Sequence, residues 1–251
     1  MEFPTPRVTV CVLTYGDYRR LAKRVIESIR NHFPRSEYQL VVGANAVGDE
    51  TLAYLESVKK AAALDHLIVS PANLYKCPMM GRMFDGIQTE FIWWFDDDSY
   101  VQEPTAFLKW LEVARAAPES TVMWGQSAHC DNTESFTSLK DVVGFVRSAT
   151  WYRGLPPPSW RSGGKGEFNF ENRGKGDGRW FFILGGCWLI RTRTIRALNW
   201  PDPRLKDDDV FLGEAIRQNG WNLANIGTPG VALNTEPRRG NMREADAPGL
   251  K

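Results

Sequence analysis

A strand-like run that ends in three carboxylates constrains the fold of this chain more than any other feature. Residues 91–95 read FIWWF, a run of aromatic and β-branched side chains typical of a buried strand, and Asp96, Asp97 and Asp98 follow directly. An isolated acidic triplet is more often a solvated turn or a helix cap. Here the acids adjoin a core strand, and α/β sheets bind ligands at the carboxyl ends of their strands. The sequence therefore predicts an α/β fold with a ligand site at this triplet.

Three adjacent carboxylates repel one another, so a positive charge has to offset them. Mn²⁺ and Mg²⁺ prefer carboxylate oxygen and leave room for substrate phosphates. A second acidic cluster, residues 207–209, lies about 110 residues later and opens a helix-like segment. Asp207 and Asp208 also suit a plain helix cap. Our hypothesis is that these two clusters form an active site, in which one cluster binds a metal ion and the other transfers protons.

Strand-like and helix-like segments alternate along the chain, which is typical of βαβ units. This alternation predicts a Rossmann-like, mixed and mostly parallel sheet flanked by helices. A helix over residues 210–218 should end at Asn219 and Gly220, and one or two strands should follow in residues 222–233. The other predicted strands span residues 8–14, 39–44, 66–69, 91–95, 121–124 and 181–190, and the other predicted helices span residues 18–31, 49–63, 77–86 and 104–116.

Composition excludes several classes of protein. No apolar run approaches the roughly 20 residues of a membrane span, and the first ten residues do not resemble a signal peptide. The four cysteines lack metal-site spacing, which argues against structural zinc and a disulfide framework and suits the reducing cytoplasm. With three histidines and no GxSxG segment, Ser-His-Asp hydrolysis is poorly supported. We therefore expect a cytoplasmic protein without a membrane span.

Basic residues concentrate in residues 147–196, which hold ten Lys or Arg against three Asp or Glu. Within this segment, residues 153–180 are rich in Gly, Pro and Lys and predict an irregular basic lid. Aromatic side chains interleave with the cations, and such a surface suits a glycan or small-molecule acceptor, or a nucleic-acid base such as a hydroxymethylated pyrimidine in DNA. The near-neutral net charge favours the glycan or small molecule. A solvated loop explains the charge equally well.

Several segments together resemble nucleotide-sugar glycosyltransferases of the GT-A fold. VTVCVLTYGDYRRLAKRVIESI resembles the opening strand and helix of family 2, and residues 73–98 resemble its N-x-G…R-N-x-G…DxD block. WWFDDDSYV, LGGCWLIRTRTI and DDDVFLGEAI resemble the DDDTYV, GGGYVLS-type and EDVYVG motifs of fringe-like transferases. The resemblance implies a single catalytic domain over residues 1–251, with a nucleotide-sugar-binding half at residues 7–126 and an acceptor-side half at residues 127–251.

The resemblance also implies roles for the acidic residues. Asp98 would bind the Mn²⁺ or Mg²⁺ that bridges a nucleotide diphosphate, and Asp96 would reach the ribose or the water shell of the metal. Asp97 would belong to the same donor site but point elsewhere. In the EDV-type motif the acid before Val is the general base of inverting enzymes, here Asp209, with Asp208 beside it.

The remaining site residues follow from the same motifs. Asn45 stands where family 2 usually has an acid that holds the uracil or ribose, and no histidine follows His129 to serve as a late metal ligand. The implied donor, most simply a UDP-sugar, would contact Thr14, Tyr15, Asp17 and Arg82. The implied acceptor side comprises Gly185, Gly186, Trp188 and, from the lid, Trp180.

Two other classes of protein stay open on the sequence. A haloacid-dehalogenase-type phosphatase also has DxD at a strand end, but Tyr100 stands where that pattern requires Thr or Val. A noncatalytic carbohydrate-binding protein would account for the ten tryptophans, yet it needs neither the acidic triplet nor Asp209.

Overall fold

The computed structural model describes residues 6–131, 179–198, 209, 212–213, 215–216 and 219–233. The helices and strands, in chain order, are β1 (Val8–Gly16), α1 (Arg19–His32), η1 (Arg35–Glu37), β2 (Tyr38–Val47), α2 (Asp49–Lys60), β3 (His66–Ser70), α3 (Lys76–Phe84), β4 (Phe91–Asp96), β5 (Tyr100–Val101), α4 (Ala106–Ala116), β6 (Thr121–Asp131), β7 (Arg179–Arg191), α6 (Thr192–Ala197), β8 (Asn222–Asn225) and β9 (Val231–Ala232).

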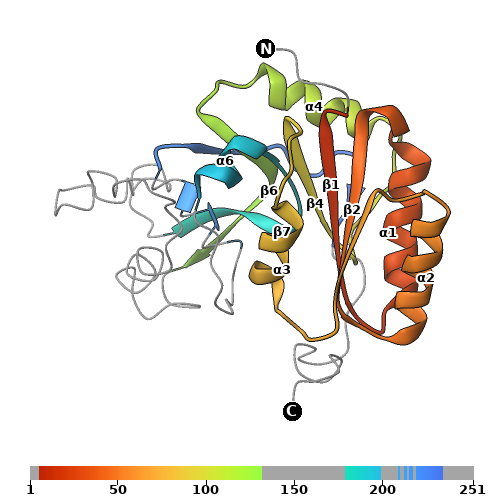
Figure 1. The fold of residues 1–251 in the computed structure, drawn as a ribbon. Helices are drawn as coiled ribbons and strands as arrows, with labels where there is room; N and C mark the ends of the chain where they lie inside the picture. The colour runs from red at the N-terminus through yellow and green to blue at the C-terminus, as the bar shows by residue number, and fades with distance from the viewer. Residues whose placement is uncertain are drawn as a thin grey trace.

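The described residues form a seven-stranded sheet in the order β3-β2-β1-β4-β7-β6-β8 (Figure 1). β1 pairs in parallel with β2 and β4, β2 pairs in parallel with β3, and β6 pairs in parallel with β8. Strand β7 is antiparallel to both of its neighbours, β4 and β6. The predicted mixed, mostly parallel α/β sheet is therefore confirmed.

The centre of the sheet is buried on both faces, and β4 shows how the sequence achieves this. Phe91, Trp93 and Phe95 pack in one core with side chains of α1, α2 and α4. Ile92 and Trp94 pack in the other core with the methionines of α3 and Ile195 of α6. Successive side chains of a strand point to opposite faces, so an unbroken apolar run requires helices on both sides. Figure 1 shows α1 and α2 on one side of the sheet and α3 on the other.

The second half differs from the predicted boundaries. Strand β6 continues to Asp131 and β7 begins at Arg179, because these two residues pair at the end of a long antiparallel ladder. The prediction that the irregular lid extends to Trp180 is therefore wrong for its last two residues, which are β7 backbone. Residues 153–178 of the predicted lid lie outside the described part of the chain.

Several short elements escaped prediction, and α3 ends at Phe84 rather than at residue 86. The six residues of α6 and the two-residue strands β5 and β9 are too short to show a hydrophobic period. None of the helices in the described residues is long and apolar enough to cross a membrane.

The helix that contains Asp209 ends as predicted. Residues 209, 212, 213, 215 and 216 are helical. Gly220 has φ of 77°, and the Trp221 amide donates to the Ile216 carbonyl at 3.2 Å. A positive-φ glycine with a bond from the next amide to a carbonyl five residues earlier is a Schellman ending.

Candidate active site

Three parallel strands end at the same edge of the sheet and bring predicted donor-side residues together. Tyr15 of β1 lies opposite Asn45 of β2, and Leu13 of β1 lies opposite Asp96 of β4. Beyond β1, the exposed Asp17 accepts a hydrogen bond from Thr51 at 3.3 Å. The polar residues that the sequence places after separate strands are therefore neighbours at the carboxyl edge.

Two of the predicted donor-side residues, Thr14 and Asn45, form hydrogen bonds with other groups of the protein. The buried Thr14 hydroxyl donates to the Gly43 carbonyl at 3.2 Å. The buried Asn45 amide donates to Asn73 Oδ1 at 3.0 Å, and its oxygen accepts the Leu74 amide proton at 2.8 Å. Asn45 therefore fixes the turn before α3, while Asp17 stays exposed to solvent at the edge.

The acidic triplet forms a turn at the end of β4, closed by the Ser99 amide, which donates to the Asp96 carbonyl at 3.0 Å. Asp97 and Asp98 are only 1% and 9% exposed. From α1, the Arg24 guanidinium donates to the Asp98 carbonyl at 3.4 Å and lies 4.4 Å from the centre of the Tyr100 ring. The triplet is thus a buried turn packed against α1, not a solvated loop.

One backbone residue of β7, Gly185, joins the two acidic clusters. Its amide donates to Asp209 Oδ2 at 3.1 Å, and its carbonyl accepts a hydrogen bond from Lys76 Nζ at 3.2 Å. The same ammonium donates to Asp96 Oδ2 at 3.1 Å. Asp96 of the first cluster and Asp209 of the second therefore flank a single point of the fold.

Lys76 was not predicted as a site residue. It is the first residue of α3, and its side chain is 21% exposed. A lysine at a helix start carries no periodic signal, so only the need for a cation beside three carboxylates pointed toward such a residue. Asp208 lies outside the described residues, and Asp209 is the member of its cluster that the structure describes.

On the acceptor side, the two predicted glycines and Trp188 differ in what they offer a ligand. A Cβ on Gly185 would lie 2.9 Å from Lys76 Nζ, so any larger residue there would displace the ammonium from its present position. Gly186 is buried beside it. Trp188 is buried and stacks on Trp94 at 5.6 Å and 11°, so its ring lies beneath the site and offers no open face to an acceptor. The Trp180 side chain is outside the described part of the structure.

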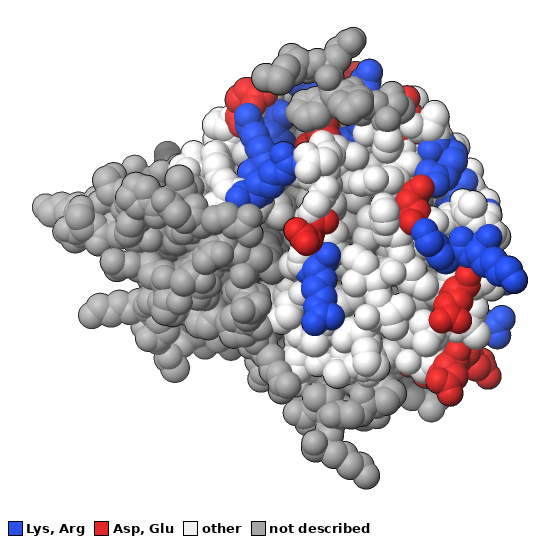
Figure 2. Space-filling view, viewed as in Figure 1, with Lys and Arg blue, Asp and Glu red and all other residues white. Residues whose placement is uncertain are grey.

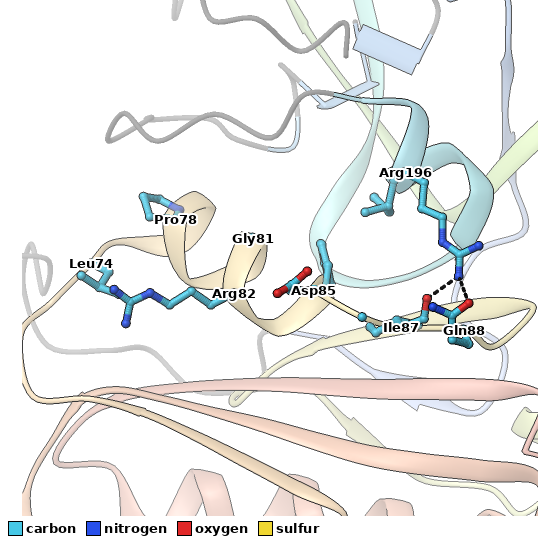
Figure 3. A pocket seen from close by; sticks show the side chains of 11 residues that line it. Leu74, Pro78, Gly81, Arg82, Asp85, Ile87, Gln88 and Arg196 are labelled. Atoms are coloured by element: carbon cyan, nitrogen blue, oxygen red, sulfur yellow. Dashed lines mark hydrogen bonds between the residues drawn. The ribbon is translucent and has the colours of Figure 1, made fainter. Parts of the chain in front are cut away.

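Arg82 lies in a pocket of about 610 Å³ between α3, the loop after it, and α6. Its guanidinium extends along α3 toward Leu74, whereas Arg196 from α6 donates to the Ile87 carbonyl and to Gln88 (Figure 3). In the described part of the chain, Asp96 is not among the residues that line this pocket.

The described basic side chains of residues 147–196 contact protein groups. The Arg191 guanidinium donates to the backbone carbonyls of Ala114 and Thr121, and Arg193 forms an ion pair with Glu119. On the face that Figure 2 shows, the described basic and acidic side chains are interspersed rather than sorted by sign. This part of the segment therefore gives no support to a nucleic-acid partner, and most of the segment lies outside the described residues.

The acidic turn offers a divalent cation part of a coordination shell. Within the described residues, no group of three or more Asp, Glu, His or Cys side chains forms a ready-made metal cage. The turn at residues 96–98 does offer hard carboxylate oxygens. Mg²⁺-like ions are commonly held by one or two carboxylates together with substrate phosphates, so this donor set fits a cation that binds with a nucleotide diphosphate.

The chain is similar to one protein family and to several solved structures. A family model described as "Glycosyltransferase like family 2" matches residues 6–241. A mannosyltransferase from Pyrobaculum calidifontis, solved with GDP-Man and Mn²⁺, superposes with a TM-score of 0.61 at 16% identity over 94% of this chain. Residues 1–349 of S. aureus TarS, solved with UDP-GlcNAc, superpose with a TM-score of 0.52 at 13% identity over 88% of it.

These structural likenesses establish the fold alone. The chain spans 59% of the mannosyltransferase and 56% of the TarS fragment. No curated protein matches the sequence.

Proposed function

The chain belongs to the glycosyltransferase-like family 2, and we propose that it transfers a sugar from a nucleotide diphosphate sugar to an acceptor hydroxyl. The observation that carries this proposal is the Gly185 junction, which holds Asp96 and Asp209 on either side of one backbone residue. A donor-side acid and an acceptor-side acid at one point are what a single displacement needs.

In the proposed reaction, Asp209 acts as general base. Its carboxylate removes the proton of the acceptor hydroxyl, whose oxygen forms a bond to the anomeric carbon of the donor sugar. The bond from that carbon to the diphosphate breaks, and the diphosphate leaves with the electron pair. Attack opposite the leaving group gives an inverted anomer. The Gly185 amide, 3.1 Å from Asp209 Oδ2, orients the carboxylate.

The donor half of the proposal rests on the carboxyl edge of β1, β2 and β4. Tyr15 and Asp17 would contact the nucleotide base, and Asn45 would act through the turn that it fixes. Asp98 would hold Mn²⁺ or Mg²⁺, which when bound neutralises the charge that develops on the departing diphosphate. A UDP-sugar is the first candidate donor, and a glycan or small molecule is the proposed acceptor.

Donor binding and hydrolysis test the proposal without a known acceptor. Thermal unfolding with UDP- and GDP-sugars in the presence of Mn²⁺ should show a rise in melting temperature for the donor that binds. Asp209→Asn should keep that rise, because the amide oxygen still accepts the Gly185 bond, but should lower release of the nucleotide diphosphate roughly 10²–10⁴-fold.

Asp85→Asn is the matched control, because this exposed carboxylate lies in the pocket beside α6 and outside the junction. It should leave turnover unchanged. Near-normal turnover of Asp209→Asn, or a retained anomer by NMR, would overturn the assignment of the base. No stabilisation by any nucleotide sugar would overturn the proposed activity itself.

A further inference from the structure

The Lys76 ammonium lies between Asp96 on the donor side of the site and Gly185 on the acceptor side. Its Nζ lies 3.1 Å from Asp96 Oδ2, 3.2 Å from the Gly185 carbonyl and 5.7 Å from the centre of the Trp94 ring. On the other side, Trp94 Nε1 donates to Asp96 Oδ1 at 2.9 Å. Both oxygens of the Asp96 carboxylate therefore accept hydrogen bonds from protein donors.

The backbone that presents Lys76 is strained. Tyr75 has φ of 66° and ψ of 175°, a conformation that side-chain-bearing residues rarely adopt. Asn73 Oδ1 holds this turn by accepting the Tyr75 amide proton at 2.7 Å, and Asn45 in turn donates to Asn73. Strain of this kind persists only where the surrounding contacts fix it, and it clusters at functional sites.

Gly185 of β7 contacts the same ammonium and carries no side chain. A Cβ at Gly185 would come within 2.9 Å of Lys76 Nζ, so the glycine makes room for the ammonium. A strained turn, a glycine and an ion pair thus converge on one cation. They come from three separate segments of the chain.

We propose that Lys76 is a positioning residue. Its ion pair with Asp96 prevents that carboxylate from binding a divalent cation, so the cation binds Asp98 instead. A cation bound to Asp96 would lie within a few ångströms of the ammonium, and like charges in a partly buried site repel strongly. This inference rests on the proposed function, because it concerns the metal that would accompany the donor diphosphate. Asp96 then remains a donor-side residue of the site but is not a ligand of the metal.

Mn²⁺ binding to the full chain, without nucleotide or turnover, tests the inference. The electron paramagnetic resonance signal of free Mn²⁺ gives the dissociation constant for the wild type, Lys76→Met and Lys76→Arg. Lys76→Met should bind Mn²⁺ about tenfold or more tightly than the wild type, because the competing charge is gone and Asp96 becomes a second ligand. Lys76→Arg, which keeps the charge, should match the wild type.

Two further variants identify the ligands. Adding Asp96→Asn to Lys76→Met should abolish the gain, and Asp98→Asn alone should weaken the binding seen in the wild type. Circular dichroism and melting temperature show that each variant is folded. Unchanged or weaker Mn²⁺ binding by Lys76→Met overturns the inference, as does a gain that survives Asp96→Asn, or the absence of Mn²⁺ binding in both proteins. Because the titration needs no donor, failure of the proposed function shows separately, as absent binding of nucleotide sugars.

Discussion

Replacing Gly185 by alanine adds one methyl group at the junction. Compared with a control glycine elsewhere in the sheet, it separates loss of turnover from loss of stability. The new Cβ would lie 2.9 Å from Lys76 Nζ and 3.5 Å from Asp209 Cβ. The ammonium is the far end of a flexible side chain, so it is the group that moves. Its hydrogen bonds to Asp96 and to the Gly185 carbonyl are then lengthened and weakened.

The loss in free energy of unfolding can be estimated from these two hydrogen bonds. A hydrogen bond to a charged group contributes about 1.5–3 kcal/mol when protected from water. Lys76 and Asp96 are 21% and 26% exposed, so solvent screens part of that energy. We expect the free energy of unfolding to fall by about 1–2 kcal/mol, which lowers the melting temperature of a chain of this size by roughly 2–8 °C. Donor hydrolysis should fall at least tenfold, because the displaced ammonium no longer holds Asp96 beside residue 185, whereas the residue 185 amide still donates to Asp209.

Gly125→Ala is the matched control. Its Cβ would lie 2.5 Å from Ile183 Cγ2 and 3.1 Å from the Cys187 carbonyl oxygen, inside the β6–β7 ladder. Overpacking of this kind costs about 1–3 kcal/mol. Thermal unfolding by circular dichroism and nucleotide diphosphate release should show similar destabilisation of both variants but loss of turnover in Gly185→Ala alone. Wild-type turnover in Gly185→Ala, or equal loss in Gly125→Ala, would refute the reasoning.

Three further outcomes are expected. Asp98→Asn should remove the Mn²⁺-dependent part of the stabilisation by a nucleotide sugar in a thermal-shift assay, whereas full turnover in excess EDTA would contradict the metal assignment. Arg191→Leu should lower the free energy of unfolding by about 3 kcal/mol in urea, because two backbone carbonyls lose a buried donor, and should leave donor affinity unchanged. Burial raises the pKa of the Cys11 and Cys187 thiols, so the unfolded chain ionises first. The contribution of these two thiols to stability should therefore be constant below about pH 8.5 and fall above it by roughly 1.4 kcal/mol per pH unit for each thiol, a slope that the double alanine variant should lack.

The sequence by itself determined the layers of the fold. The unbroken apolar run of β4 places Trp93 and Trp94 on opposite faces, so it requires helices on both sides of the sheet. Gly220 ends the preceding helix because glycine adopts a positive φ without strain, a preference that depends only on the residue type. The position of Asp96 at a strand end follows in the same way, since the strand and the acid are adjacent in the chain.

The tertiary structure alone decided what these residues contact. The sequence could not show that the ring of Trp188 stacks on Trp94 beneath the site, because alternation along a strand tells which residues share a face but not which face meets solvent. Nor could it show that Lys76 binds Asp96 and Gly185, since these three residues lie on α3, β4 and β7 and meet only when the sheet assembles. Periodicity reports local geometry, whereas the charge balance of a site depends on side chains that are far apart in the chain.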